Sequence, residues 1–177
     1  YLSLNLLTMM KFVLVGATLI LALNSCKKKD TPCTREAGST VAPASEEQMI
    51  TDYLTANNIT NAVELNNSGL YYTITTQGST ERAEQCSVLR VKYVGKLTNG
   101  TIFDQTQGDN IVSFELGTLI EGWKRTLTLI GEGGKIKLYV PPSMGYGSTD
   151  RVNPQTGQII IPKNSVLIFE IELVTIT

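Results

Sequence analysis

Large aromatic side chains in the second half of the chain are the residues best placed to do chemistry. Each lies beside a glycine, a proline or a short run of residues typical of a β-strand. They are Tyr93, Phe103, Phe114, Trp123, Tyr146 and Phe169. Trp123 is the single tryptophan and follows Gly122 at the start of a helical pattern. Brought together, these rings would line an apolar pocket without a charged nucleophile, which suits the binding and twisting of a peptide bond.

Composition excludes several classes of enzyme and partner. The 177 residues contain no histidine, which removes Ser-His-Asp and Cys-His catalysis and most zinc sites. We therefore expect neither a metal nor a cofactor. The formal net charge is −1, whereas nucleic-acid binding requires a clustered basic face, so we expect no nucleic-acid partner. The length suffices for one domain with its own core, plus appendages.

The first 25 residues predict a signal peptide. Met9-Met10-Lys11 precedes an apolar run, residues 12–23, that has the length of a secretory signal and is short for a bilayer span. Residues 1–8 lie upstream of the first methionine, which favours an over-extended gene start. The run ends in Leu23-Asn24-Ser25-Cys26, which resembles a bacterial lipobox and predicts lipidation of Cys26. The alternative is an ordinary signal peptide with a chance cysteine.

Residues 26–44 are rich in Lys, Thr, Pro, Gly, Ser and Ala, and we expect a lipid-anchored flexible tether. Several acyl chains on Cys26 would anchor the protein stably, since burial contributes about 0.8 kcal/mol per methylene. Residue 27 is lysine and not the aspartate that often retains lipoproteins at the inner membrane. We therefore expect the protein in the bacterial cell envelope, at the outer membrane, facing either the periplasm or the cell surface.

Cys33 and Cys86 are the other two cysteines. An exported protein resides where disulfides persist, so the two residues either form a bridge or remain free thiols. Connectivity does not follow from sequence alone, and both alternatives stay open. No base accompanies either thiol, so neither is expected to be catalytic.

Residues 45–67 predict a short helix followed by a linker. Ser45 and Gln48 fit a capping box, with Ser45 as N-cap. Apolar residues then recur four apart, which indicates an amphipathic helix over 45–57 that ends at Asn57-Asn58. We expect this helix to pack on the main domain or to mediate contacts between chains in a dimer.

From Gly69 onward, apolar and polar residues alternate as in half-buried antiparallel strands. The alternation predicts strands at 70–75, 88–97, 102–103, 111–116, 135–140 and 167–173, with a turn at Asn99-Gly100. One helical stripe interrupts them, formed by Ile120, Trp123, Leu127 and Ile130, and Gly131 is its expected C-cap. Residues 143–163 show no periodicity, and a loop of that length in a compact domain is usually functional. The pattern is that of an α+β domain.

The order of the motifs resembles the FKBP-type peptidyl-prolyl cis-trans isomerases over roughly residues 68–175. The motifs are Val91-Lys92-Tyr93-Val94-Gly95, Gly100-Thr101-Ile102-Phe103-Asp104, Phe114-Glu115-Leu116-Gly117, Ile120-Glu121-Gly122-Trp123, Gly131-Glu132-Gly133-Gly134-Lys135, Pro141-Pro142, Tyr146-Gly147, Ile160-Ile161-Pro162, and the run 167–173. Any one of them is weak, but the whole succession is specific. The lipobox and the preceding helix resemble bacterial lipoprotein members of that family. The resemblance implies an isomerase domain over 68–177, with an FKBP-like antiparallel half-barrel wrapped around one short helix.

The resemblance also implies roles for individual residues. Trp123 would form the pocket floor, Tyr146 would offer its hydroxyl to a substrate carbonyl, and Asp104 would tune polar contacts at the pocket edge. The implied catalytic set is Tyr93, Phe103, Asp104, Trp123, Tyr146 and Phe169, and the implied substrate-binding set is Leu119, Ile120, Ile160 and Ile161. Each aromatic could instead be plain core. Val112 stands where the family often has an aromatic residue, which weakens the expected grip on macrolide inhibitors and on the residue before proline.

Three functional hypotheses remain at this stage. The first is a prolyl isomerase that acts on X-Pro bonds of exported proteins by stabilising the twisted amide non-covalently. The second is an FKBP-like chaperone or binding module with little turnover. The third is a structural lipoprotein that dimerises through the 45–57 helix. The sequence keeps all of the implied pocket residues together, which favours the first hypothesis, because a binding module without turnover would be expected to have lost several of them.

Overall fold

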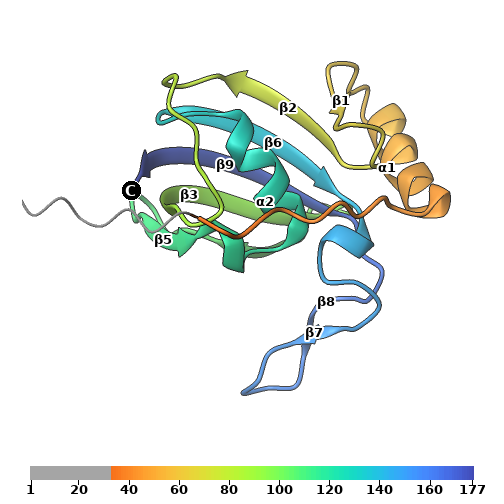
Figure 1. Cartoon of the computed structure of the whole chain (residues 1–177). Coiled ribbons are helices and arrows are strands. Elements are labelled where there is room, and N and C mark those ends of the chain that lie inside the picture. The colour runs from red at the N-terminus through yellow and green to blue at the C-terminus, as the bar shows by residue number, and fades with distance from the viewer. Residues whose placement is uncertain (1–32) are drawn as a thin grey trace, which may run out of the picture. The chain divides into compact units, whose positions relative to one another are not determined.

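The alternating segments assemble into one antiparallel sheet (Figure 1). The computed structural model describes residues 33–177; residues 1–8, the expected signal peptide and Cys26 lie outside them. The strands of the main sheet are β1 (Val63–Glu64), β2 (Tyr71–Thr76), β3 (Val88–Leu97), β4 (Ile102–Gln105), β5 (Val112–Glu115), β6 (Gly134–Val140) and β9 (Leu167–Ile176). Their order is β1-β2-β6-β9-β3-β4, and β5 also pairs with β3.

Alternation along the central strands divides the sheet into an apolar inner face and a largely charged outer face. On β9, buried Leu167, Phe169, Ile171 and Leu173 belong to the main core, while Glu170 between them is exposed. The turn between β3 and β4 forms at Asn99-Gly100 as predicted, with Gly100 at φ 85°. The predicted α+β, FKBP-like half-barrel is confirmed.

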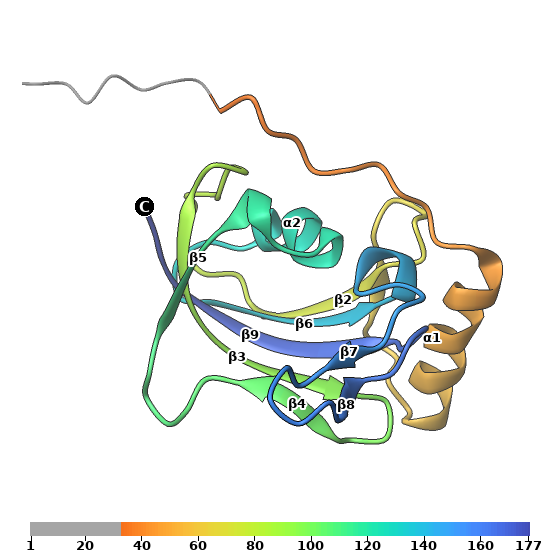
Figure 2. The ribbon, with the colours of Figure 1, turned by 90° about the horizontal axis from the view of Figure 1, so that it is seen from below.

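The helix of the inner face is α2 (Glu121–Thr126), which continues into the 3-10 turn η2 (Leu127–Leu129). It lies in the hollow of the curved sheet (Figure 2). The predicted C-cap at Gly131 is wrong, because the α-helix already ends at Thr126 and its C-cap is Leu127. Gly131 is needed for a close approach instead: a Cβ there would lie 2.2 Å from the carbonyl oxygen of Ser79.

The N-terminal helix α1 (Ala44–Ala56) packs on the outer face where β6 ends and β9 begins. Its buried residues, Ile50 and Leu54, contact a cluster that includes Tyr139 and Ile168. The expected end at Asn57 is confirmed, but the capping box is wrong. The N-cap is Pro43, two residues earlier than expected, so Ser45 lies inside the first turn, and no side chain of residues 33–177 caps this end. No helix in residues 33–177 has the length and apolar character needed to cross a bilayer.

Residues 33–43 belong to the segment expected to be a flexible tether, yet they lie across α2 as an extended strap (Figure 2). A disulfide joins Cys33 to Cys86, which resolves the two alternatives for these cysteines in favour of the bridge. Arg35 pairs with Glu115, and Arg125 of α2 donates a hydrogen bond of 2.7 Å to the carbonyl of Thr40. The strap is therefore held by the disulfide to Cys86, by an ion pair to β5 and by a hydrogen bond to α2.

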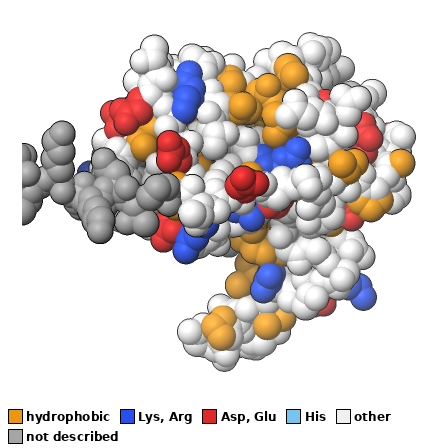
Figure 3. All heavy atoms as spheres, in the orientation of Figure 1, with side chains coloured by type: hydrophobic (Ala, Val, Ile, Leu, Met, Phe, Trp, Pro, Cys, Tyr) orange, Lys and Arg blue, Asp and Glu red, His pale blue; other side chains and the backbone are white. Residues whose placement is uncertain are grey.

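The long segment 143–163 projects from the sheet and contains a short hairpin that lacked a sequence signal (Figure 1). After the 3-10 turn η3 (Pro142–Met144), β7 (Arg151–Val152) pairs with β8 (Ile159–Ile161). Val152, Ile159 and Ile160 are exposed, and Figure 3 shows both hydrophobic and basic side chains on this lobe.

Candidate active site

An apolar hollow of about 250 Å³ opens on the inner side of the sheet, beside the start of α2. Its walls come from β3, β4, β5, β9, the segment before α2 and the loop after η3. The lining residues are Tyr93, Asp104, Phe114, Thr118, Leu119, Ile120, Trp123, Tyr146 and Phe169. Residues from both halves of the sheet thus meet around the single tryptophan.

Trp123 forms the floor of this pocket. Only 4% of the residue is exposed, and its ring meets three others edge-to-face. The centroid distances are 5.3 Å to Tyr93, 5.3 Å to Phe169 and 6.3 Å to Phe114. Edge-to-face contacts are the preferred geometry for aromatic pairs, so the rings support one another in a rigid wall.

Glycine at position 122 lets α2 bring Trp123 close to the sheet. A Cβ at Gly122 would lie 2.7 Å from Cγ1 of Val140 on β6. Thr126 fastens the next turn by donating a hydrogen bond of 2.6 Å to the Gly122 carbonyl. The indole Nε1 makes no hydrogen bond within residues 33–177 although it is buried. Unpaired buried donors are rare, and a group of a bound ligand can serve as the partner of this one.

On the opposite wall, Gly95 permits close packing of side chains, as Gly122 does beside Trp123. It pairs with Phe169 of β9 on one side and with Asp104 of β4 on the other. A Cβ at this position would lie 2.7 Å from the ring of Phe103 and 3.0 Å from that of Phe169. The two rings therefore pack edge-to-face directly over the strand, with 5.5 Å between centroids.

The pocket has few polar groups, and some of them already form hydrogen bonds within the protein while others do not. Tyr93 donates a hydrogen bond of 2.5 Å to Oδ2 of Asp104. Burial, followed by this hydrogen bond and the nearby carboxylate, raises the pKa of Tyr93 well above its usual range. Burial also raises the pKa of Tyr146. Both phenols therefore stay protonated at neutral pH and remain hydrogen-bond donors.

Besides the indole Nε1 of Trp123, two more donors of the pocket are free for a ligand. Within residues 33–177, neither the Tyr146 hydroxyl nor the backbone N–H of Ile120 makes a hydrogen bond. The Ile120 carbonyl is engaged, since it accepts from the N–H groups of Trp123 and Lys124 at 3.0 and 3.1 Å. The pocket thus combines an apolar floor with two donors that can hold carbonyl oxygens.

The structure brings together most of the residues expected at the site. Tyr93, Asp104, Leu119, Ile120, Trp123, Tyr146 and Phe169 line the pocket. The other three expected residues lie outside the lining. Phe103 packs behind Phe169, Ile161 is buried in the main core, and Ile160 is 38% exposed on the hairpin. Adjacent residues of a strand face opposite sides, which separates Ile160 from Ile161.

Thr118 lines the pocket but was not predicted as a site residue. Its position directly before Leu119 is the one sequence feature that could have indicated it. It ends the 3-10 turn η1 (Leu116–Thr118) and donates a hydrogen bond of 2.7 Å to the Glu115 carbonyl. Phe114 was expected among the aromatic residues that line a pocket but was given no catalytic or substrate-binding role, and its ring lies against that of Trp123. The register of β5 on β3 places it there, since Phe114 pairs with Leu89.

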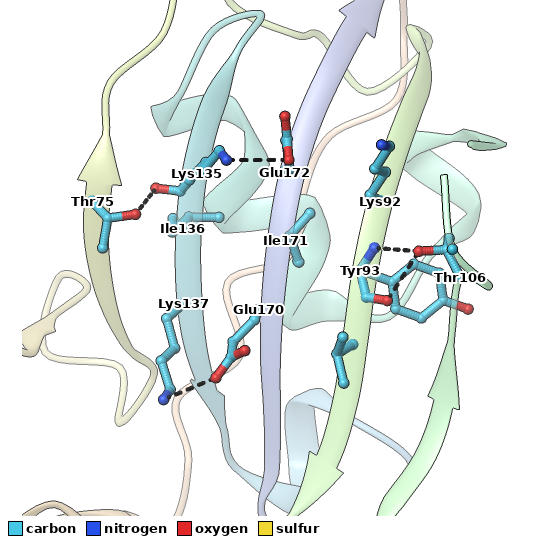
Figure 4. Close-up of a pocket in the computed structure, with 12 residues that line it drawn as sticks. Thr75, Lys92, Tyr93, Thr106, Lys135, Ile136, Lys137, Glu170, Ile171 and Glu172 are labelled. Carbon is cyan, nitrogen blue, oxygen red and sulfur yellow. Dashed lines mark hydrogen bonds and ion pairs between the residues drawn. The ribbon is translucent and has the colours of Figure 1, made fainter. Parts of the chain in front are cut away.

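A larger hollow, about 540 Å³, lies over the outer face of the sheet (Figure 4). Its Lys and Glu side chains neutralise one another across β6 and β9: Lys135 pairs with Glu172 at 3.3 Å and Lys137 with Glu170 at 3.2 Å. This hollow is more open than the aromatic pocket, and charged side chains that pair with one another alternate with the apolar residues of its lining. The aromatic pocket is the better candidate for chemistry.

Comparison with known proteins agrees with the geometry. The family model of the FKBP-type peptidyl-prolyl cis-trans isomerases matches residues 79–174, more than half of the chain. A probable FKBP-type peptidyl-prolyl cis-trans isomerase of Haemophilus influenzae is 36% identical over 115 residues, which cover 64% of this chain and 45% of that protein. FkpA of Escherichia coli is 36% identical over 116 residues, covering 64% and 40%. The chain thus spans less than half the length of these curated relatives.

Solved structures show the same fold. The crystal structure of FkpA from Escherichia coli superposes with a TM-score of 0.63 and 32% identity, covering 76% of this chain and 60% of that one. A peptidyl-prolyl cis-trans isomerase from Pseudomonas syringae superposes with a TM-score of 0.62 and 26% identity, covering 79% and 99%. From the motif order, the sheet around α2, the aromatic pocket and these matches, we conclude that the chain belongs to the FKBP-type peptidyl-prolyl cis-trans isomerase family.

Proposed function

We propose that this protein is a peptidyl-prolyl cis-trans isomerase that acts on X-Pro bonds of exported polypeptides. The observation that carries the proposal is the aromatic pocket itself: Trp123 forms its floor, and at its edge the Ile120 N–H and the Tyr146 hydroxyl have no hydrogen-bond partner in the described part of the chain, residues 33–177. Membership of the family supports the same reaction.

The chemistry requires no nucleophile, which fits a chain without histidine. An X-Pro amide resists rotation because resonance is lost at the twisted midpoint, with a barrier of about 18–20 kcal/mol. The twisted amide is less polarised than the planar one. An apolar site therefore favours the twisted form over the planar substrate, and this difference in binding lowers the barrier.

Each wall of the pocket would have a distinct task. The proline ring would lie on Trp123, between Tyr93 and Phe169. The Ile120 N–H and the Tyr146 hydroxyl would hold substrate carbonyls, so that one part of the peptide stays fixed while the bond rotates. Asp104 would tune polar contacts at the edge, with its Oδ2 already held by the Tyr93 hydroxyl. Phe103 and Ile161 would act from behind the lining, by supporting the wall.

The location of the activity follows from the expectations for residues 1–32. Lipidation of Cys26 would hold the protein at the membrane of the cell envelope, where newly exported chains fold. The Cys33–Cys86 disulfide supports an oxidising compartment, since such bonds are rare in the cytosol. Labelling of cells with a clickable fatty acid should mark the wild-type protein and leave Cys26→Ser unmarked; equal labelling would refute lipidation.

Dimerisation through α1 stays a prediction. Ile50 and Leu54 are used in packing on the sheet, but Met49 is 43% exposed on the same helix. Sedimentation of the full chain and of Met49→Glu would test it, and a monomer in both cases would exclude this contact.

The experiment that tests the isomerase proposal compares two variants in a prolyl-peptide isomerisation assay. Tyr146→Phe removes one hydrogen bond of about 0.5–1.5 kcal/mol, so the specificity constant should fall about two- to tenfold with an unchanged melting temperature. Trp123→Ala should abolish most activity and lower the free energy of unfolding by about 3–5 kcal/mol as a cavity opens. Trp123→Phe keeps an aromatic floor and separates loss of activity from loss of folding.

Tyr53→Phe is the matched control, since Tyr53 lies on α1 and packs against Tyr139 on the outer face. It should retain full activity. A wild-type chain that binds prolyl peptides without accelerating isomerisation would contradict the enzyme proposal and favour a chaperone or binding module. An unchanged rate in Tyr146→Phe would show that its hydroxyl does not hold the substrate.

A further inference from the structure

Among residues 33–177, Arg151 forms no ion pair with a carboxylate, unlike six of the ten other basic side chains described there. Within residues 33–177, ion pairs join six other basic side chains to Asp or Glu: Arg35, Lys92, Lys96, Lys124, Lys135 and Lys137. Arg151 is exposed, and its guanidinium lies over the ring of Tyr146, with 4.9 Å between Cζ and the ring centroid. Because Tyr146 lines the aromatic pocket, an unneutralised positive charge lies at the rim.

The hairpin holds this charge in place. Arg151 begins β7 and pairs with Ile161 of β8. Below that pair, the Lys163 N–H donates to Oδ1 of Asp150 at 2.6 Å, and the Asn164 N–H donates to the Gly147 carbonyl at 2.8 Å. These bonds close the base of the hairpin. Stacking on an aromatic face also suits the planar guanidinium, so the side chain is held over the Tyr146 ring.

The other charges near the rim leave Arg151 available. Asp104 lies among the lining residues, and its Oδ2 accepts the Tyr93 hydroxyl. Asp150 adjoins Arg151 in sequence, but its Oδ1 accepts the Lys163 N–H, and it forms no ion pair with Arg151. Burial is the largest cause of the raised pKa of Tyr146. The charge of Asp104 raises this pKa further and that of Arg151 lowers it, so both charges act on the Tyr146 hydroxyl. The rim therefore carries a carboxylate on the β4 side and a cation on the hairpin side.

We propose that Arg151 determines specificity by selecting proline-containing segments that carry a carboxylate next to the proline. The inference rests on the proposed isomerase function, since it concerns the substrate of that pocket. The apolar floor and walls recognise proline but cannot distinguish charged neighbours. A guanidinium at the rim can do so, because it presents a fork of donors that matches a carboxylate.

The test uses two series of short peptides with the full chain. One series has Glu, Gln or Lys directly before proline, and the other has the same residues directly after it. Isomerisation is followed by NMR exchange spectroscopy without a coupling protease, and binding is measured by titration of the same peptides. In one of the two series, the wild type should favour Glu over Lys by about two- to fivefold, the size expected of an exposed ion pair.

Three variants locate the effect. With each variant measured relative to its own Gln peptide, Arg151→Gln should remove the preference for Glu over Lys, and Arg151→Glu should reverse the order of Glu and Lys. Arg90→Gln, on the outer face of β3, removes an exposed cation away from the pocket and should change nothing. In about 1 M salt the wild-type preference should shrink, because the screening length falls to about 3 Å.

The outcomes separate this inference from the proposed function. Isomerisation of all peptides without charge preference, or a preference that survives Arg151→Gln, overturns the role of Arg151 and leaves the isomerase standing. Binding that depends on Arg151 without any acceleration supports Arg151 as the selecting residue and overturns the enzyme. A chain that neither binds nor isomerises any of the peptides overturns both.

Discussion

Loss of the Cys33–Cys86 disulfide should destabilise the domain strongly, because the bridge fastens the strap that covers α2. The bond closes a loop with a sequence separation of 53 residues. In the chain-entropy model, a loop of this size stabilises the folded state by about 4 kcal/mol. For a domain of this size each kcal/mol corresponds to about 2–4 °C, so we expect the melting temperature to fall by about 8–16 °C.

The bridge also supports one wall of the pocket. Cys86 lies between Gln85 and Ser87, whose carbonyls accept hydrogen bonds from Gly117 and Leu116 at 2.7 and 3.0 Å. These residues precede Thr118 and Leu119 of the lining. Reduction should therefore lower isomerase activity at temperatures where the domain is still folded, as this wall loosens.

The assay is thermal unfolding followed by circular dichroism, in a Cys26→Ser background that prevents exchange with the third thiol. Cys33→Ser, Cys86→Ser and the double variant should show the same loss, because any of them removes the same bond. Complete reduction should lower the melting temperature of the parent and leave Cys33→Ser unchanged. A parent whose melting temperature moves by less than about 2 °C on verified reduction would refute the reasoning: the ion pair of Arg35 and the hydrogen bond to Thr40 would then hold the strap unaided.

Three further perturbations test separate parts of the structure. Gly95→Ala would place a Cβ 2.7 Å from the Phe103 ring, so we expect a loss of about 1–3 kcal/mol in urea unfolding together with reduced activity; full activity would show that the rings can yield. Ile50→Ala, at a fully buried position of α1, should cost about 2–5 kcal/mol in the same assay and leave the kinetics of the residual folded protein unchanged, whereas a stability equal to wild type would mean that α1 is not docked in solution. Burial first, then the Glu47 hydrogen bond, raises the pKa of Tyr71 to about 12, and that of Tyr93 is raised too. Unfolded tyrosine ionises near pH 10, so these groups stabilise the fold fully below that pH, and their contribution should be lost as pH rises toward about 12. Alkaline unfolding curves of wild type and Tyr71→Phe check this, with a smaller alkaline loss expected in the variant and identical curves contradicting it.

Strand alternation and motif order were readable from the sequence because each depends on neighbouring residues. Apolar residues at every second position of 88–97 and 167–173 predicted strands with one buried face; β3 has it, whereas β9 is also buried on its outer face at Ile168, where α1 packs. The aromatic residues that now meet around Trp123 could be named in advance, since their spacing matched a known succession. The capping box at Ser45 did not form, because the N-cap is Pro43, two residues earlier, and the Gln48 side chain donates a hydrogen bond of 2.7 Å to Asp52 instead.

Only the tertiary structure decided which residues share a surface. Phe103 and Ile161 belong to the expected motifs, but both lie behind the pocket lining, and Phe103 does so because its ring packs against that of Phe169. Thr118 lines the pocket because it ends a 3-10 turn, which has no periodic signal in the sequence. The strap was expected to be a flexible tether, and it lies fastened across α2 because Cys33 meets Cys86. In the sequence, nothing distinguishes Arg151 from other basic residues. In the structure, its stacking on Tyr146 places it at the pocket rim. Local patterns determine secondary structure and buried faces, whereas contacts between distant segments depend on where the folded backbone brings them, and these contacts make up the site.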